Sequence, residues 1–435
     1  MPHLINKNPD HLTRDSHGIR REDIPRNALT VTDGLVRKGY QAYLVGGCVR
    51  DLVAGLEPKD FDVATDARPE EIRKVFRSCR LIGRRFRLAH VHFGRDYIEV
   101  ATFRGSGTGN EKQRRTENGR ILADNVYGSL DEDAHRRDFT VNALYFDPQC
   151  EEVLDFVGGF DDLTQQRIRL IGDPEARFRE DPVRLLRAVR FAAKLSLDID
   201  PATESPMAGL AGLLRDVPSA RLFDEMLKLL MGGHGLASYR LARKYGFFDV
   251  LFPDTVRVMA NNDGYHAMLE AAMANTDDRI RTGKPVTPAF LFATLLWPAY
   301  CEALQLQGNG DKPNFVIRQN AADQVIASQV RRISVPRRFS SPMREIWQMQ
   351  PRFAVQRGKK AKRLMSHPRF RAAYDFLLLR VREDPNLEPL AQWWTEIQEL
   401  SPSAVNRRLF GQRRRSRRGR GGNGRGDGGG HADET

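Results

Sequence analysis

The pattern of apolar and polar positions divides this chain into two halves of different character. Between Leu29 and about Tyr145, short β-rich runs alternate with stretches of helical pattern such as residues 69–76. The β-rich runs are residues 42–45, 60–63, 98–103 and 143–146. From Asp181 onward β signals almost vanish, and apolar residues recur at helical spacing. The pattern therefore predicts an α/β head built on a sheet, followed by an all-α remainder.

Proline and glycine punctuation divides the helical half into helices of ordinary length, with no fixed-period repeat. We expect five segments: a flexible N-terminal segment (1–28), an α/β head (29–146), a helical neck (147–215), an all-helical body (216–400) and a disordered Arg/Gly-rich tail (401–435). The tail has almost no apolar residues, so it is expected not to fold. The polar stretch 105–125 is expected to be a mobile loop within the head.

The charge balance favours a polyanionic partner. Lys and Arg number 69 against 56 Asp and Glu, a formal net charge of +13. Nine arginines against three acidic residues give the last 35 residues a charge of +6, which leaves +7 for the rest. The most apolar stretch, residues 290–297, ends at Pro298 and is far shorter than the roughly 20 residues that a bilayer span needs. We therefore expect a buried helix there, no membrane span, and nucleic acid as the partner.

The cysteines and the N-terminus indicate a cytoplasmic protein without zinc. Cys48, Cys79, Cys150 and Cys301 are scattered without a CxxC pair, which argues against a zinc site and against a disulfide framework. They are interpreted as ordinary buried thiols. The polar N-terminus has no apolar segment of a secretory signal, so the cytoplasm is the expected location.

The strongest local motif is AYLVGGCVRDLVAG at residues 42–55. A β run leads into the Gly46-Gly47 turn, and a helical segment that carries Arg50 comes next. Such a turn presents backbone N–H groups to an anion without side-chain obstruction, and Arg50 adds a bidentate phosphate donor one turn into the helix. A Gly-Gly pair alone usually makes only a turn, so this interpretation needs the support of the acidic run directly after the motif. With that support, the motif predicts a cradle for a triphosphate.

Asp60 and Asp62 form that acidic run, KDFDVAT. Side chains two apart on a strand share a face, so both carboxylates point the same way while Phe61 and Val63 anchor the other face. Asp-x-Asp usually marks a solvated turn, but the apolar flanks argue against a turn here. Mg²⁺ prefers one or two carboxylates plus phosphate oxygens, and a metal pair about 3.5–4 Å apart activates an attacking hydroxyl and stabilises a departing pyrophosphate. The pair predicts a two-metal Mg²⁺ site.

A third acid would complete this site, and two candidates stay open. Glu99 lies in the strand-like run YIEVATF, which would deliver it directly if that strand neighbours the one with Asp60. Asp138 lies in HRRDFTVNALYF, where Arg136 and Arg137 would lower its pKa and contact phosphate or ribose. An ordinary surface ion pair is equally compatible with the second spacing.

Residues 178–195, FREDPVRLLRAVRFAAKL, predict a helix with Asp181 as N-cap and Pro182 as its first residue. Arg184 and Arg187 then lie along one side, opposite the apolar face. Two interpretations stay open. The segment is either a capped helix with solvated arginines, or a rigid mount for a carboxylate and a guanidinium that hydrogen-bond the edge of a nucleobase.

Taken in order, LVGGCVRD, KDFDVAT, RRDFTVNAL and REDPVRLLRAVRFA resemble the motifs of the class II nucleotidyltransferases of the polymerase-β-like superfamily. These comprise the bacterial poly(A) polymerases and the CCA-adding tRNA nucleotidyltransferases. The resemblance is dense over 42–195 and extends over about 30–380. It implies an α/β nucleotidyltransferase head with a polymerase-β-like mixed sheet, followed by an all-α neck and body that bind RNA.

The resemblance also implies roles for single residues. It matches Asp60 and Asp62 to the metal-binding carboxylates and Asp138 to an acidic active-site position, whereas Glu99 rests on geometry. The expected nucleotide-binding residues are Gly46, Gly47, Arg50 and Arg137 on the phosphate and ribose side, and Asp181, Arg184 and Arg187 at the base.

Three features favour the poly(A) polymerase branch. The run GRRFRLAHV supplies Arg84, Arg85 and Arg87 in the form seen in poly(A) polymerases, although a structural ion-pair cluster is an equally good interpretation. The helical half lacks the His-Asp dyad of the phosphohydrolase domain that is fused to some CCA-adding enzymes. The tail suits sequence-indifferent contacts with RNA phosphates. Its expected RNA-binding residues are Arg413, Arg414, Arg415, Arg417 and Arg418.

The resemblance thus implies a polynucleotide adenylyltransferase that adds AMP from ATP to RNA 3′ ends, with two Mg²⁺ ions as cofactor and pyrophosphate as product. A role in RNA turnover and RNA-decay proteins as partners would be in keeping with it. Two rival interpretations remain: a CCA-adding tRNA nucleotidyltransferase, and a non-catalytic RNA-binding protein with a degenerate transferase head.

Overall fold

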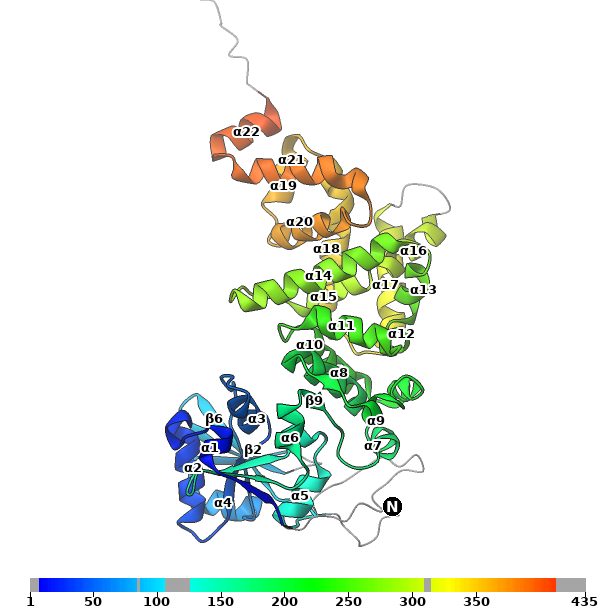
Figure 1. Ribbon diagram of the computed structural model, residues 1–435. Helices are drawn as coiled ribbons and strands as arrows, with labels where there is room; N and C mark the ends of the chain where they lie inside the picture. Colours follow the sequence, from blue (N-terminus) through cyan, green and yellow to red (C-terminus); the bar gives the residue numbers. More distant parts are fainter. Residues whose placement is uncertain (1–7, 84–86, 106–125, 309–313, 412–435) are drawn as a thin grey trace, which may run out of the picture. The chain divides into compact units, whose positions relative to one another are not determined.

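The computed structural model describes residues 8–83, 87–105, 126–308 and 314–411. The chain forms two compact units, Met1–Arg344 and Glu345–Thr435. The boundary between them falls within helix α18 (Arg337–Met349). The first unit contains a mixed β-sheet and a series of helices, and the described part of the second unit is helical (Figure 1). The predicted order of an α/β head and a helical body is confirmed.

The large sheet has eight strands in the order β1-β8-β7-β2-β3-β6-β5-β4. Neighbouring strands are antiparallel except β3 and β6, which run parallel. The strands are β1 (Asp10–Leu12), β2 (Ala42–Val45), β3 (Asp62–Thr65), β4 (Cys79–Ile82), β5 (Leu88–Phe93), β6 (Asp96–Thr102), β7 (Leu144–Asp147) and β8 (Glu152–Asp155). β3 starts at Asp62 instead of Asp60 because its partner β2 ends at Val45, opposite Asp62, which leaves Asp60 without a ladder partner.

Different helices cover the two faces of the sheet. Three helices, α2 (Arg26–Val36), α3 (Gly47–Val53) and α4 (Pro69–Val75), contribute to the core on one face, with Val31, Val49 and Ile72 fully buried against Val63 and Val100. On the other face, α5 (Leu130–Arg136) brings Ala134 against a separate cluster. That cluster contains Val45, Ala64, Phe103, Tyr145, Leu154 and Phe156. Alternate residues of β2 and β3 therefore enter different cores, as a two-sided strand requires.

The N-terminal segment is folded from residue 10 onward, so the prediction that 1–28 is flexible is wrong for this part. β1 pairs with β8 at the edge of the sheet, and α1 (Arg14–His17) comes after it. Ile19 and Ile24 are buried in the core of the sheet. Nε2 of His17 lies 3.1 Å from the carbonyl oxygen of Glu151, beside β8. Because Ile19 and Ile24 stand among many polar residues in the sequence, their apolar contacts with the core were not predicted.

The rest of the first unit is almost entirely helical. Its helices are α6 (Gly159–Thr164), α7 (Pro174–Glu180), α8 (Val183–Leu195), α9 (Pro201–Glu204), α10 (Ser219–Leu230), α11 (Gly235–Lys244), α12 (Phe247–Leu251), α13 (Pro253–Met259), α14 (Asp263–Arg281), α15 (Pro288–Leu295), α16 (Trp297–Gly308) and α17 (Phe315–Val330). One small parallel pair, β9 (Arg167–Ile168) with β10 (Asp198–Ile199), interrupts them. Because β10 lies beyond Asp181, the helical half is not purely α.

Helix α15 confirms the buried helix expected near residue 290, since Leu291 and Phe292 are at most 2% exposed. No single helix in the described ranges has both the length and the apolar character to cross a membrane. The pair α15 and α16, bent by 54° at the break between them, meets those two criteria together by length and composition.

The second unit is built around Trp394, which is fully buried and donates from Nε1 to the carbonyl oxygen of Phe353 at 2.9 Å. Its helices are α19 (Gly358–Met365), α20 (Phe370–Arg380), α21 (Glu388–Glu399) and α22 (Pro402–Phe410). The 3-10 helices among the described residues of both units are η1 (Arg21–Asp23), η3 (Thr140–Asn142), η4 (Ala211–Asp216), η5 (Gln350–Ala354) and η6 (Pro385–Leu387). The predicted tail boundary at 401 is too early, because Val405 and Leu409, one helical turn apart, pack α22 onto this core.

The cysteines differ from the expected set of buried thiols. Cys48 is buried, Cys79 and Cys301 are half-buried, and Cys150 is exposed after β7. The loop expected over 105–125 lies outside the described residues except for Gly105.

Candidate active site

Two acids on adjacent strands form the centre of the site. Asp62 starts β3 and stands in register with Glu99 of β6. Directly paired residues of neighbouring strands project from the same face, so the two carboxylates lie side by side. Asp60 precedes the strand by two residues and is exposed. The structure therefore brings Glu99 to Asp62, as its predicted strand position required, while its catalytic role stays a prediction.

Desolvation by the surrounding protein, together with nearby negative charge, raises the pKa of Asp62 to about 6. Loss of solvent around the carboxylate is the largest cause of the rise. The negative charges of Glu99 and Asp60 raise the pKa further, whereas the positive charge of Arg137 lowers it. Asp62 forms no salt bridge with any residue of the described ranges. A cation bound there would relieve this repulsion, so the donor set fits a divalent metal.

The described side chains do not by themselves form a complete metal site. Within the described parts of the chain, no group of three or more His, Cys, Asp or Glu residues is arranged to hold a metal ion. Mg²⁺ commonly binds through one or two carboxylates and takes its remaining ligands from substrate phosphates and water. Asp60 and Asp62 can supply such carboxylates, and their role as metal ligands stays a prediction.

The glycine turn opens beside these acids. Gly46 directly follows Val45, the residue of β2 that pairs with Asp62. Its φ of +79° and ψ of −128° belong to a region that is essentially restricted to glycine. A Cβ built on Gly46 would lie 3.5 Å from Nη1 of Arg137. Gly46, Asp62 and Arg137 are therefore gathered at one end of the sheet, and α3 starts there at Gly47.

Arg137 is held in place from behind by two side chains. Its Nε donates to the hydroxyl of Tyr145 at 2.9 Å, and its Nη2 donates to Oδ2 of Asp133 at 3.1 Å. The Tyr145 hydroxyl in turn donates to Asp133 at 2.7 Å. Burial would lower the pKa of the Arg137 guanidinium, but Tyr145 and Asp133 outweigh it and the pKa is raised. A fixed positive charge thus stands beside the acids and the turn.

Asp138 belongs to a different network. Its Oδ2 accepts a hydrogen bond from Nε of Arg187 at 2.6 Å, and its Oδ1 accepts from the Asn142 amide at 3.3 Å. Burial would raise the pKa of Asp138, but the charge of Arg187 and these hydrogen bonds outweigh it and lower the pKa. Of the two candidates for the third acid, Glu99 is the one that shares a sheet face with Asp62, whereas Asp138 is already paired.

Arg50 is part of the same buried network. It is 3% exposed, its Nε donates to Asp51 at 2.8 Å, and its Nη1 donates to Oδ1 of Asn142 at 2.6 Å. Asn142 therefore links Arg50 to Asp138. The Phe191 ring of α8 packs beneath these cations, with the guanidinium carbons of Arg50 and Arg187 5.2 and 5.3 Å from its centroid. A contact between Arg50 and phosphate stays a prediction, since its guanidinium already has protein partners.

The start of α8 differs from the sequence prediction. The helix begins at Val183 with Pro182 as its N-cap, and Asp181 is the C-cap of α7 instead of the N-cap of α8. The Asp181 carboxylate accepts two hydrogen bonds from Arg221 of α10, at 2.8 and 2.6 Å. Its Oδ1 also accepts a hydrogen bond from the backbone N–H of Val183 at 3.4 Å, so the acid serves both a tertiary ion pair and the first turn of α8.

The two arginines of α8 that the sequence singled out, Arg184 and Arg187, are paired with other groups of the protein. Arg184 is 9% exposed, and its Nη1 donates to Glu180 and to the carbonyl oxygen of Arg177, at 2.7 and 2.8 Å. Arg187 pairs with Asp138. The interpretation of both as solvated side chains on a capped helix is therefore wrong, while base recognition by them stays a prediction.

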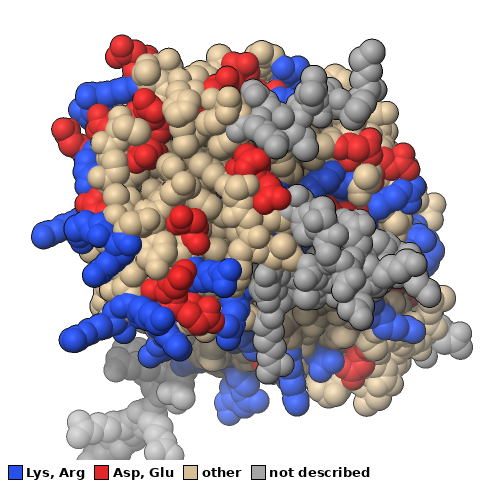
Figure 2. All heavy atoms as spheres, turned by 90° about the horizontal axis from the view of Figure 1, so that it is seen from below, with Lys and Arg blue, Asp and Glu red and all other residues tan. Residues whose placement is uncertain are grey.

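The predicted RNA-binding arginines fall mostly outside the described residues. Arg87 is half exposed and pairs with Glu70 of α4. Arg84 and Arg85 are among those outside, as are Arg413, Arg414, Arg415, Arg417 and Arg418. On the face in Figure 2, Lys and Arg side chains are interspersed with Asp and Glu, and no single-sign patch dominates. This face alone therefore provides no basic surface of the kind expected for RNA.

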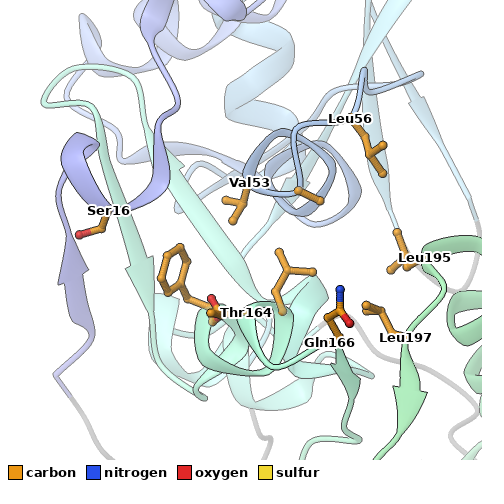
Figure 3. Close-up of a pocket in the computed structure, with 10 residues that line it drawn as sticks. Ser16, Val53, Leu56, Thr164, Gln166, Leu195 and Leu197 are labelled. Atoms are coloured by element: carbon orange, nitrogen blue, oxygen red, sulfur yellow. The ribbon is translucent and has the colours of Figure 1, made fainter.

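A cavity of about 420 Å³ lies away from these acids (Figure 3). Its lining residues come from α1, α3, α6, the end of α8 and the segments after α3, α6 and α8. They are Ser16, Val53, Ala54, Leu56, Phe160, Leu163, Thr164, Gln166, Leu195 and Leu197. None of the predicted site residues is among them, so the cavity does not bear on the predicted chemistry.

Several supporting residues were missed from the sequence. Asp133 and Asn142 stand four residues before Arg137 and four after Asp138, and this helical spacing was a signal that could have found them. Arg221 had no such signal, because it pairs with Asp181 across forty residues.

Comparison with known proteins gives three family matches along the chain. Residues 42–169 match the poly A polymerase head domain, residues 196–259 match a probable RNA and SrmB-binding site of polymerase A, and residues 311–425 match the polymerase A arginine-rich C-terminus. The head match contains every sheet residue of the site described above.

Solved structures with a similar fold include CCA-adding enzymes. The Bacillus stearothermophilus CCA-adding enzyme in complex with CTP aligns with a TM-score of 0.55 at 24% identity, over 86% of this chain and 82% of that one. An apo form of a CCA-adding enzyme aligns with a TM-score of 0.59 at 20% identity, over 89% and 87%. At these identities the likeness shows the fold, and it confirms the predicted mixed-sheet head with a helical body.

Curated relatives are more similar in sequence. Poly(A) polymerase I of Salmonella typhi is 49% identical over 90% of this chain and 87% of its own length. Poly(A) polymerase I of Haemophilus influenzae is 46% identical over 87% and 86%. A CC-adding tRNA nucleotidyltransferase of Halalkalibacterium halodurans is 36% identical over 52% and 54%. The chain therefore belongs to the bacterial poly(A) polymerase family of polynucleotide adenylyltransferases.

Proposed function

We propose that this protein adds AMP from ATP to RNA 3′ ends without a template and releases pyrophosphate. One observation carries the proposal. Identity to proteins named poly(A) polymerase I extends at 46–49% over 87–90% of the chain. Relatives named for CC or CCA addition are 32–36% identical and match 50–68% of it. The similarity to the first group therefore continues through the helical body, which is the part expected to determine how RNA is held.

The acids and Arg137 divide the chemistry in this proposal. Asp60 and Asp62 hold Mg²⁺, which supplies charge neutralisation at the phosphates and lowers the pKa of the attacking 3′ hydroxyl. Glu99 adds a third negative charge beside Asp62. Arg137, held by Tyr145 and Asp133, stabilises negative charge that develops on the α-phosphate. Positioning and charge compensation account for most of the rate.

The nucleotide lies between the Gly46-Gly47 turn and the start of α8 in this proposal. The turn and Arg50 hold the β- and γ-phosphates. Asp181 and Arg184 present an acceptor and a donor to the base, and Arg187, which is held by Asp138, is a third residue at the base. Asp181 accepts two hydrogen bonds from Arg221 and a longer one from the backbone N–H of Val183, which leaves one of its four lone pairs for the base.

The same proposal gives each segment of the chain a task. The head at 29–146 carries the chemistry, the neck at 147–215 selects the nucleotide, and the body at 216–400 and the tail hold RNA. Arg84, Arg85 and Arg87 lie along the primer, and the tail arginines bind phosphates without sequence preference. In this proposal the protein acts in the cytoplasm, takes part in RNA turnover and has RNA-decay proteins as partners.

Extension of one RNA with single nucleotides tests the proposal. Purified full-length protein receives a labelled, unstructured RNA and Mg²⁺ with ATP, CTP, GTP or UTP alone. In parallel it receives a tRNA that lacks its 3′ CCA, with CTP and ATP together. The proposal predicts a long ladder with ATP and little extension with the others. Addition that stops after CCA on the trimmed tRNA would instead establish a CCA-adding enzyme. RNA binding without any nucleotide addition would leave only the non-catalytic RNA-binding alternative.

A further inference from the structure

An aromatic group continues the sheet face that carries the acids. Glu99 of β6 pairs in register with Asp62 on one side and with His90 of β5 on the other. One step along the same two strands, Tyr97 pairs with His92. Because residues two apart on a strand share a face, Tyr97 lies on the face of Glu99, and His92 lies on the face of His90.

These rings form a supported but open platform. The rings of His90 and Tyr97 are stacked, with centroids 4.2 Å apart and planes 7° apart. His92 lies beside them, with its centroid 5.8 Å from that of Tyr97. Tyr97 is nevertheless 51% exposed, whereas the side chain of His90 is 14% exposed. One face of the Tyr97 ring is therefore backed by His90 while much of the ring remains open.

One polar contact links this platform to the acids of the site. Nε2 of His90 lies 3.4 Å from Oε2 of Glu99. Nε2 of His92 is buried and has no hydrogen-bond partner within the described chain. Tyr97 is therefore stacked on a histidine that contacts Glu99 and still presents aromatic surface beside the acids, where a ligand of the site can reach it.

The order of the strands indicates which ligand fits. The Gly46 turn comes after β2, on one side of β3, whereas Tyr97 lies on β6, on the other side. Asp62 stands between them. Nucleotidyl transfer requires the attacking hydroxyl and the leaving pyrophosphate to be roughly in line on opposite sides of the α-phosphate. If the turn holds the triphosphate, the attacking RNA end must approach from the side of Tyr97.

The spacing suits a nucleoside. Tyr97 lies two residues from Glu99, which is about 7 Å along the strand. Every nucleobase has a π face, so stacking on an aromatic ring tolerates any sequence, as an enzyme that accepts many RNA ends requires. We propose that Tyr97, backed by His90, stacks on the base of the 3′-terminal RNA nucleotide and so directs its hydroxyl toward Asp62. This proposal rests on the proposed function, since it assumes that an RNA end is the attacking group.

Fluorescence of the terminal base tests the platform without turnover. An RNA with 2-aminopurine as its last nucleotide is titrated with full-length protein, without ATP and with EDTA. Stacking quenches this base, so wild type and Tyr97→Phe should quench it, while Tyr97→Leu should leave it bright and bind this RNA about 5- to 150-fold more weakly. Phe315→Leu, which removes a 56% exposed ring of α17, is the matched control and should quench like wild type.

A change in the RNA separates stacking from damage to the protein. Wild type should bind an RNA that ends in an abasic nucleotide more weakly than the RNA with an intact terminal base. Tyr97→Leu and wild type should bind the abasic RNA with equal affinity. Equal quenching by wild type and Tyr97→Leu, or equal losses for Tyr97→Leu on both RNAs, would overturn the platform. A raised equilibrium dissociation constant of Tyr97→Leu for ATP, with quenching unchanged, would do so too and assign the ring to the incoming base. Because none of these readouts needs turnover, a wild type that fails to extend RNA with ATP contradicts the proposed function separately.

Discussion

Two acidic groups in the same unit have opposite surroundings. Asp62 and Glu99 lie side by side on an open sheet face, and the pKa of Asp62 is raised to about 6. Asp138 is buried against Arg187 and Asn142, and its pKa is lowered. The two carboxylates of the first group repel each other, and a bound cation would relieve that repulsion. The carboxylate of the second group is already neutralised by the Arg187 guanidinium. Acids of similar prominence in the sequence therefore have different tasks: one group would do chemistry, and the other would hold the site in shape.

The largest expected effect comes from the open group. Asp62→Asn should lower the single-turnover rate of AMP addition by about 10³-fold or more, because the position can no longer hold a divalent cation. Its thermal midpoint should not fall, since the Asp62 carboxylate forms no salt bridge with the described residues. The rate is measured by quenched extension of a labelled RNA, and stability by calorimetry. An Asn variant within tenfold of wild type would remove Asp62 from the chemistry.

Replacement of Asp138, the acid of the paired group, should affect the stability of the protein more than its chemistry. Asp138→Asn should lower the free energy of unfolding by about 3 kcal/mol, because it leaves the Arg187 charge partly buried without its partner. The pKa of Asp138 is lowered on folding, so this deficit should stay constant from pH 8 to 5 and narrow only below the ordinary Asp pKa of 3.8. Urea unfolding at several pH values measures it. A deficit that shrank between pH 8 and 5 would contradict the pairing.

A third acid, Asp181, is paired with Arg221, and this pair extends the comparison to nucleotide binding. Arg221→Met should raise the KM for ATP about tenfold with a smaller change in kcat, because Asp181 loses the guanidinium that orients it. Arg240→Met is the matched control, since Arg240 also makes two hydrogen bonds to one carboxylate, that of Glu270, at an exposed site on α11. Equal KM values for the two variants would show that the orientation of Asp181 does not matter.

The smallest effect on chemistry is expected from the tail. Removing residues 412–435 keeps α22 intact and deletes seven arginines, so RNA affinity should fall and its salt dependence should flatten. The dissociation constant is measured at several salt concentrations. Single-nucleotide addition at saturating RNA should stay within about twofold, and a lost chemical step would contradict a purely tethering role.

The sequence predicted the sheet positions of the site well because the signals were local. The run at 42–45 became β2, and Glu99 came to lie on the strand beside Asp62. Short β-rich runs were sufficient to predict these two strands, whereas the pairing of β6 with β3 was left open by the sequence.

Tertiary pairing was what the sequence did not reveal. Asp181 was expected to cap α8, and it accepts a hydrogen bond from the Val183 N–H at 3.4 Å, but its two shorter hydrogen bonds come from Arg221 of another helix. Arg184 was compatible with a solvated side chain, but it is buried against Glu180. Helical spacing cannot distinguish an arginine that faces water from one that faces a partner distant in sequence.

The Mg²⁺ dependence of single-turnover AMP addition tests the contrast between the two groups most directly. Glu99→Gln should raise the Mg²⁺ concentration for half-maximal rate about tenfold, because it removes negative charge beside Asp62. Asp138→Asn should leave that midpoint at its wild-type value even where its maximal rate is lower. A midpoint shifted by Asp138→Asn and unchanged by Glu99→Gln would contradict the account and make Asp138 the acid that acts with the metal.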